Sequence, residues 1–196
     1  MPVKATVTKE DILRGALSLL RRSGEEAVNA RTLAAEAGCS TQPIYRLFSG
    51  MGELLSELMP LAMEIYRGYV TQAATEGPPY RAYGMGYVRM ARDDPHLFRY
   101  IFMNPHTPPA GSDNPDVLFG EGVGALRQGA PLSDTPAEGF HMEMWIFTHG
   151  LAVLQATGYY PMKDEEISRL FTVEYQSLLA YYQQKEKEGG APDERH

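Results

Sequence analysis

The sequence contains almost none of the features that mark secreted, disulfide-stabilised or membrane-spanning proteins. Its 196 residues include a single cysteine, Cys39, so no internal disulfide can form, and this usage suits a reducing compartment. No uninterrupted apolar run approaches the roughly 20 residues needed to cross a bilayer. Charged residues also interrupt the N-terminal segment, so no signal peptide is expected. These absences predict a cytoplasmic protein with no membrane partner.

Sequence motifs for enzymatic chemistry are lacking as well. The chain has no glycine-rich phosphate loop, nucleophile elbow or zinc-binding pattern. His141 and His149 are eight residues apart, which is about 12 Å along a helix and too far for one metal ion. The sequence therefore predicts neither an enzyme nor a bound metal or cofactor.

Positive charge is scarce overall but is distributed unevenly. The formal net charge is −7. Residues 1–54 carry seven basic side chains against six acidic ones, so the net charge of −8 on residues 55–196 accounts for the acidity of the chain. An acidic protein is a poor general partner for nucleic acid, but this distribution permits DNA binding by the N-terminal part.

What the chain does have is helical periodicity along nearly its whole length. Thr8 and Asp11 form a capping-box pattern before the first apolar run, and Gly24 is placed to end that helix. No segment alternates with the period of a strand, and residues 104–115 have the composition of a loop. The sequence predicts an all-α protein. The expected helices span residues 9–23, 30–37, 41–47, 51–72, 80–92, 95–103, 115–128, 136–157 and 163–187.

Residues 30–47 have the spacing of a helix-turn-helix, whose second helix enters the major groove of DNA. The small Ala34 and Ala37 allow close helix approach, and Gly38 is free to turn the chain. Ser40 is the expected N-cap of the second helix. Pro43 then falls in the first turn, where a missing N–H removes no helical hydrogen bond.

The side chains of this second helix divide into an inward and an outward set. Ile44 and Phe48 are expected in the core. A glutamine can pair with adenine, a threonine can contact a base edge, and a tyrosine or an arginine can reach phosphates. The outward residues are Thr41, Gln42, Tyr45 and Arg46. An ordinary helical hairpin has the same spacing, so the pattern alone leaves both interpretations open.

The segment 8–54 includes "LAAEAGCS", the pair Ile44–Tyr45, and Leu54 after a glutamate. With these features it resembles the N-terminal DNA-binding domain of TetR-family transcriptional repressors. The resemblance implies DNA contacts from residues that match the family pattern and face outward. These are Arg31, Ser40, Thr41, Gln42, Pro43, Tyr45 and Arg46.

Two positions depart from that family pattern. Leu47 stands where the family often has histidine, and Met51 stands where it often has a phosphate-contacting lysine. Losing one phosphate contact reduces the salt dependence of binding by about one unit of slope. We therefore expect the operator to be harder to infer, with the fold unaffected.

A second segment, "MWIFTHGLAVL" at 144–154, is similar to the Trp-His-Gly stretch of one group of TetR-family effector domains. The resemblance implies a C-terminal ligand pocket, and aromatic and methionine side chains suit an apolar ligand. The same side chains are also what any helical core would contain. The candidates are Tyr66, Tyr83, Tyr87, Phe98, Phe102, Met103, Met144, Trp145 and His149.

The resemblance also implies the organisation of the whole chain. Residues 1–50 would form the helix-turn-helix domain, 51–187 the effector-binding and dimerisation domain, and 188–196 a disordered tail. The expected function is a repressor that binds a palindromic operator as a homodimer, paired through its last two helices, and that a small-molecule effector releases. The alternative is a helical scaffold that binds a protein or a ligand but no specific DNA.

Overall fold

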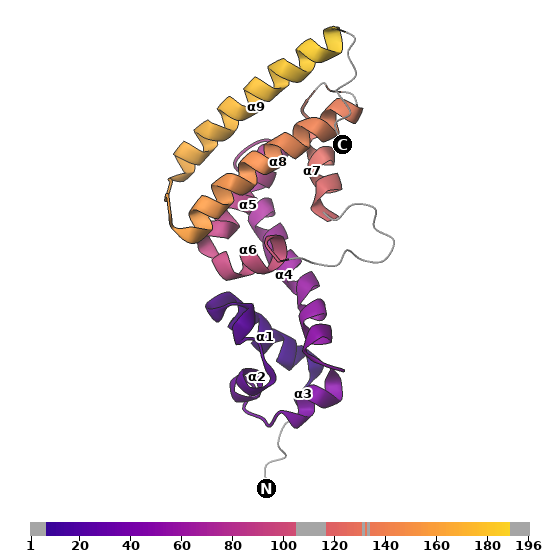
Figure 1. Ribbon diagram of the computed structural model, residues 1–196, viewed down its shortest axis with the longest axis vertical. Coiled ribbons are helices and arrows are strands. Elements are labelled where there is room, and N and C mark those ends of the chain that lie inside the picture. The colour runs from indigo at the N-terminus through magenta and orange to yellow at the C-terminus, as the bar shows by residue number, and fades with distance from the viewer. Residues whose placement is uncertain (1–6, 105–116, 131, 133, 189–196) are drawn as a thin grey trace. The chain divides into compact units, whose positions relative to one another are not determined.

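The computed structural model describes residues 7–104, 117–130, 132 and 134–188 of the chain (Figure 1). Within these ranges the regular elements are all helical, which confirms the predicted all-α class. They are α1 (Lys9–Ser23), the short 3₁₀ helix η1 (Glu25–Ala27), α2 (Ala30–Glu36), α3 (Gln42–Leu47), α4 (Met51–Ala74), α5 (Pro79–Asp93), α6 (Pro95–Phe102), α7 (Val117–Arg127), α8 (Asp134–Thr157) and α9 (Asp164–Lys187).

The predicted loop at 104–115 and the predicted tail at 188–196 lie outside the described residues, apart from Asn104 and Glu188. The described residues group into two compact units. Unit 1 contains residues 7–66 and 94–104, and unit 2 contains residues 67–93 and the described residues from 117 onward. The boundary predicted after residue 50 stays a prediction.

Local signals at the helix ends of unit 1 explain where these helices start and stop. Thr8 and Asp11 form the predicted capping box, in which Asp11 N–H donates to Thr8 Oγ1 over 3.1 Å. Asn29 caps α2 through its side-chain oxygen. Gly24 ends α1 with φ +85° and Gly38 turns the chain with φ +61°, conformations that favour glycine.

The predicted N-cap of α3 is wrong by one residue. Thr41, not Ser40, stands at the cap position, and no side-chain hydrogen bond caps this helix. The backbone N–H groups of Ile44 and Tyr45 both donate to the Thr41 carbonyl, so the helical hydrogen bonds start there. Pro43 falls in the first turn, as predicted, where the N–H that it lacks would have no partner within the helix.

Unit 2 is built around α5, which packs against α7, α8 and α9. In Figure 1, α9 runs beside α8, and these two helices contact each other. The side of α5 that faces its neighbours is almost continuously buried, so α5 is the central helix of this unit. Its buried residues are Ala82, Met85, Gly86, Tyr87, Val88, Met90 and Ala91.

Candidate functional site

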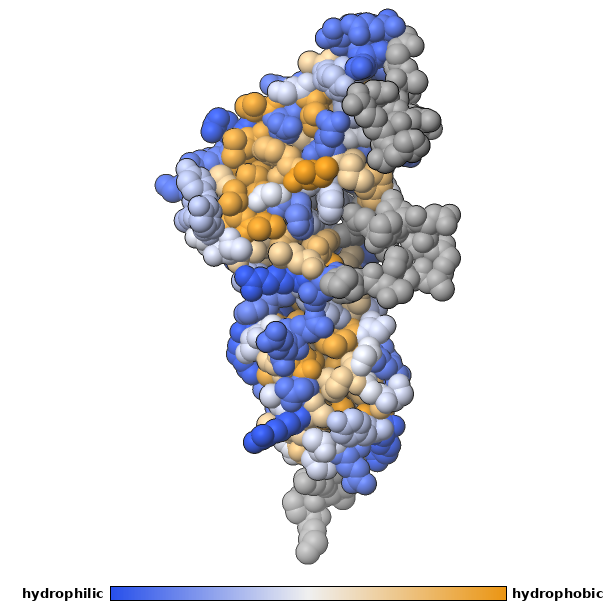
Figure 2. Space-filling view, viewed as in Figure 1, coloured by the Kyte–Doolittle hydropathy of each residue, from blue (hydrophilic) through white to orange (hydrophobic). Residues whose placement is uncertain are grey.

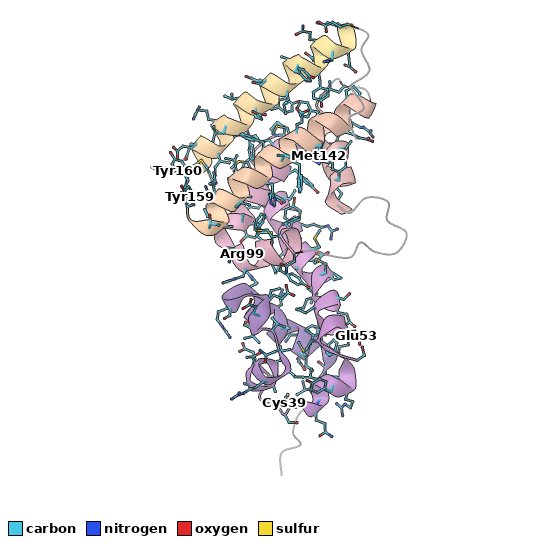
Figure 3. The ribbon with its side chains drawn as sticks, viewed as in Figure 1. Cys39, Glu53, Arg99, Met142, Tyr159 and Tyr160 are labelled. Carbon is cyan, nitrogen blue, oxygen red and sulfur yellow. The ribbon has the colours of Figure 1, made fainter. Side chains whose placement is uncertain are left out.

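In unit 1, α2 and α3 are joined by a tight turn that includes Gly38 and Cys39, the latter labelled in Figure 3. Buried apolar side chains anchor both helices. Leu33 and Ala34 of α2 and Ile44 of α3 are at most 6% exposed. Phe48, which ends α3, is 2% exposed. The inward set predicted from the sequence is therefore confirmed, and the helix pair is fixed from behind.

The opposite side of α3 faces solvent. Thr41, Gln42 and Arg46 are exposed, and Tyr45 has 60% of its surface accessible. The other predicted contacts, Arg31 and Ser40, are exposed as well, and Pro43 is half-buried. The seven predicted residues thus lie at or beside one helix-turn-helix.

Two of these residues are cations without an acidic neighbour. Arg31 and Arg46 form no ion pair with any residue that the structure describes, and neither does Arg99 on α6. An exposed guanidinium with free donors is the group that phosphate oxygens bind most readily. The remaining described cations of unit 1, Lys9, Arg14, Arg21 and Arg22, each pair with a carboxylate.

Lys9 shows how α1 and α4 are held together behind α3. Its ammonium lies 2.5 Å from Glu57 and 4.9 Å from the centre of the Phe48 ring. Glu53 accepts a 2.6 Å hydrogen bond from the Ser49 N–H at the start of α4, which lowers the pKa of this carboxyl. These contacts join the start of α1 to α4 and to the end of α3.

The predicted effector residues separate into two groups. Four of them lie in unit 1, where α4 and α6 pack together. The rings of Tyr66 and Phe102 meet edge to face at 5.3 Å, and those of Phe98 and Phe102 lie 5.4 Å apart. Tyr66 and Phe98 are fully buried, whereas Met103 is 45% exposed. Their direct role in the fold is core packing, and ligand binding by them stays a prediction.

The other group lies in unit 2, on α5 and α8. Tyr87 Oη is 2.8 Å from His149 Nδ1, and the Trp145 ring lies over the His149 ring at 5.4 Å. Met144, which precedes Trp145 on α8, is buried. The Tyr83 hydroxyl donates to Glu121 on α7. Burial lowers the pKa of His149. This group offers aromatic rings, a neutral imidazole and a hydroxyl within one unit.

A second tyrosine–histidine pair lies along the same two helices. Tyr80 Oη is 3.0 Å from His141 Nδ1, and His141 is 4% exposed. Tyr80 pairs with His141, and Tyr87, further along α5, pairs with His149, further along α8. The two helices therefore run in the same direction. Gly122 of α7 permits a close approach to this pair, because a Cβ there would lie 2.2 Å from the His141 ring. Sequence reasoning identified the histidines but not their partners, which lie some 60 residues away.

Unit 2 also contains a cleft that the sequence did not indicate, with a volume of about 420 Å³. Arg89 crosses it, donating to both carboxylate oxygens of Glu76 and to Asp164 over 2.6–2.8 Å. The hydrogen bonds from Arg89 lower the pKa of Glu76. None of the predicted effector residues is among its lining residues. These are Ala73, Glu76, Gly77, Arg81, Ala82, Met85, Arg89, Asp164, Glu165 and Ser168.

Two negative findings apply to the described part of the chain. No group of three or more histidine, cysteine, aspartate or glutamate side chains there is arranged to hold a metal ion. None of the helices within those residues combines the length and apolar character that spanning a membrane requires.

Comparison with known proteins agrees with this geometry. A model of the N-terminal domain of bacterial regulatory proteins of the tetR family matches residues 12–58, and a model of a tetracyclin repressor-like C-terminal domain matches residues 80–178. A solved structure from Vibrio parahaemolyticus, described as a TetR family transcriptional regulator, has the same fold with a TM-score of 0.60. The two are 20% identical, over 86% of this chain and 97% of that chain. No curated protein matches the sequence.

The family matches, together with a helix-turn-helix whose second helix is exposed, identify the protein as a DNA-binding transcription regulator. The family models together cover most of the chain, and the C-terminal one alone covers half of it. The chain belongs to the TetR family.

Proposed function

We propose that this protein is a cytoplasmic repressor that binds a palindromic operator as a homodimer and is released from it by a small-molecule effector. The observation that carries the DNA-binding part is the outer face of α3. It presents Thr41, Gln42 and Tyr45 to solvent while Ile44 and Phe48 fix the helix from behind. The unpaired Arg31 on α2 and Arg46 on α3 supply the charge that a phosphate backbone requires.

In this proposal the contacts have different roles. Gln42 and Thr41 read base edges, because their side chains carry the donors and acceptors that match the major groove. Arg31, Arg46 and Tyr45 contact phosphates and set the register of the helix on DNA. Ser40 and Pro43 bring the start of α3 close to the backbone. The lack of a lysine at Met51 leaves fewer phosphate contacts than many relatives would have.

The experiment that tests DNA binding measures fluorescence anisotropy of labelled fragments from upstream of the protein's own coding sequence, at several salt concentrations. Specific binding with a steep salt dependence is expected. Arg46→Ala should weaken binding to all sequences and reduce the salt slope by about two units for a dimer. Arg99→Ala, which removes an unpaired arginine from α6, is the matched control and should change neither quantity.

Gln42→Ala provides the complementary test of sequence reading. It should cost about 1–3 kcal/mol on the operator and little on unrelated DNA. A wild-type protein that binds no DNA specifically, or variants that bind like the wild type, would support the helical scaffold instead.

We further propose that the effector contacts the group formed by Tyr87, Trp145 and His149. Tyr83 and Met144, on the same two helices, remain candidates for further contacts. Trp145 is the only tryptophan of the chain and lies against His149, so its fluorescence reports on ligands at this place. A screen of apolar compounds should find one that changes this fluorescence and also lowers DNA affinity. Tyr87→Phe should weaken the binding of that compound. If the substitution left its binding unchanged, the effector would bind elsewhere.

A further inference from the structure

The helix α6 belongs to different parts of the protein by sequence and by packing. The C-terminal family model, which spans residues 80–178, includes it. By its contacts, however, the segment Asp94–Asn104 belongs to unit 1, together with the helix-turn-helix. Nearly 30 residues of unit 2 separate it in sequence from the rest of its unit. Such an arrangement raises the question of what holds α6 against the DNA-binding helices.

The first answer is close packing against α1 and α4. The buried side of α6 consists of Leu97, Phe98, Tyr100 and Ile101, each at most 8% exposed. The Tyr100 hydroxyl donates to the carbonyl of Leu55 on α4, and burial raises the pKa of Tyr100 to about 12. Gly24 at the end of α1 allows the approach, since a Cβ there would lie 3.1 Å from the ring of His96.

The second answer is a two-point ion pair between α1 and the residue that precedes α6. Arg21 Nε donates to Asp94 Oδ1 over 2.9 Å, and Arg21 Nη2 donates to Oδ2 over 2.6 Å. The Asp94 side chain is only 6% exposed. This fork geometry fixes orientation as well as distance, which a single contact does not.

The Asp94 side chain does not cap its own helix. It is the N-cap residue of α6, where an aspartate normally accepts a hydrogen bond from the first turn of its own helix. Here its side chain makes no such bond and is directed to Arg21 instead. The carboxylate therefore links α6 to α1 instead of capping α6. Because capping would stabilise α6 itself, the link to α1 indicates a role outside this helix.

We propose that Arg21 and Asp94 are positioning residues for DNA binding. They hold α6 on α1, and α1 in turn carries α2 and α3, with which it is in contact. Releasing the pair lets α1 and the reading helix depart from the arrangement that binds DNA. This inference rests on the proposed DNA-binding function, and it concerns residues that touch no DNA themselves.

Asp94→Asn and Asp93→Asn form a matched pair of variants. Both remove one negative charge, and simple electrostatics predicts equal or stronger DNA binding for both. Asp93 pairs with Arg92 on the surface of unit 2, so only Asp94→Asn removes the ion pair between α1 and the residue before α6. We expect Asp94→Asn to lower affinity for the upstream DNA fragment at least tenfold, while Asp93→Asn binds as well as the wild type or better.

A second pair of variants keeps the net charge constant. Arg21→Lys removes the fork but not the charge, and its neighbour Arg22→Lys alters an exposed pair with Glu36. DNA affinity should fall for Arg21→Lys and stay unchanged for Arg22→Lys. If Asp94→Asn fails to fold by circular dichroism, this pair decides the question.

Hydrogen exchange on the DNA-free protein tests separately whether the ion pair holds α6 in place, independently of DNA binding. The amides of residues 97–102 should lose protection in Asp94→Asn and keep it in Asp93→Asn. A folded Asp94→Asn with wild-type DNA affinity and wild-type protection would overturn the inference. A wild-type protein that binds no DNA would instead refute the proposed function, and the exchange data would still show whether the pair holds α6.

Discussion

Among the individual residues, His141 is a buried histidine whose charge state makes stability depend on pH. It is 4% exposed, and burial lowers its pKa to about 4. The ring lies against Tyr80 and Phe119 and leaves no room for a side chain at Gly122. The folded protein therefore contains a neutral imidazole at this position, whereas the unfolded chain protonates it near pH 6.5.

This difference predicts how stability depends on pH. Between pH 6.5 and 4 the unfolded chain binds the proton that the folded protein excludes, so the free energy of unfolding decreases as the pH falls through this range. The contribution is complete above pH 6.5, and its loss by pH 4 amounts to about 3 kcal/mol. Urea unfolding at pH 7.5 and pH 5 should show the part that is lost by pH 5, about 2 kcal/mol. The decrease should be smaller in His141→Gln, and an identical decrease in both proteins would contradict the prediction.

Single-residue signals in the sequence predicted the ends of helices well and long-range partners poorly. Thr8, Gly24 and Pro43 act within a few residues of themselves, and the structure confirms all three positions. The cap of α3 was wrong by one residue, because Ser40 and Thr41 are both good caps and no local rule separates them. The ion pair of Asp94 could not be predicted in this way, because its partner Arg21 lies 73 residues away and local preferences concern only nearby residues.

At the scale of helices, the contact between α4 and α5 depends on a glycine. A Cβ on Gly86 would lie 2.7 Å from the backbone of Val70, closer than real Cβ atoms come to a backbone. Gly86→Ala should therefore push the two helices apart and destabilise the protein by about 1–3 kcal/mol, as overpacking in a core does. Thermal unfolding compares it with the wild type.

Gly68→Ala on α4 is the control for this substitution. Nothing lies within 4 Å of a Cβ at that position, so only the intrinsic helix preference changes. This variant should gain about 0.5–1 kcal/mol, because alanine loses less backbone freedom than glycine. Equal stability changes for the two variants would mean that α4 and α5 adjust their separation at no cost.

At the scale of the whole molecule, large apolar side chains are exposed on α8 and α9, and Figure 2 shows hydrophobic residues on the surface of this part of unit 2. Met142 and Ile146, four residues apart on α8, are 43% and 60% exposed. Val173 and Tyr181, eight residues apart on α9, are 53% and 51% exposed. These spacings place each pair on one face of its helix, which suits packing against a second copy.

Ile146→Asp should weaken the proposed dimer, because it places a charge in an apolar interface. Sedimentation velocity at several protein concentrations should show monomer where the wild type shows dimer. DNA affinity should fall as well, because each protomer then binds a single half-site without the help of a partner. Leu61→Asp, at an exposed apolar position on α4, is the control and should remain dimeric. A dimeric Ile146→Asp would exclude this face.

The discontinuity of unit 1 has a consequence for chain synthesis and for protein engineering. Residues 94–104 complete a unit that begins at the N-terminus, so a nascent chain that has emerged only to residue 66 still lacks the helix that covers the apolar sides of α1 and α4. Fragments cut at that point would expose this surface to other chains. Hybrid regulators that exchange DNA-binding regions between relatives would need to carry both segments, with Arg21 and Asp94 taken from the same parent.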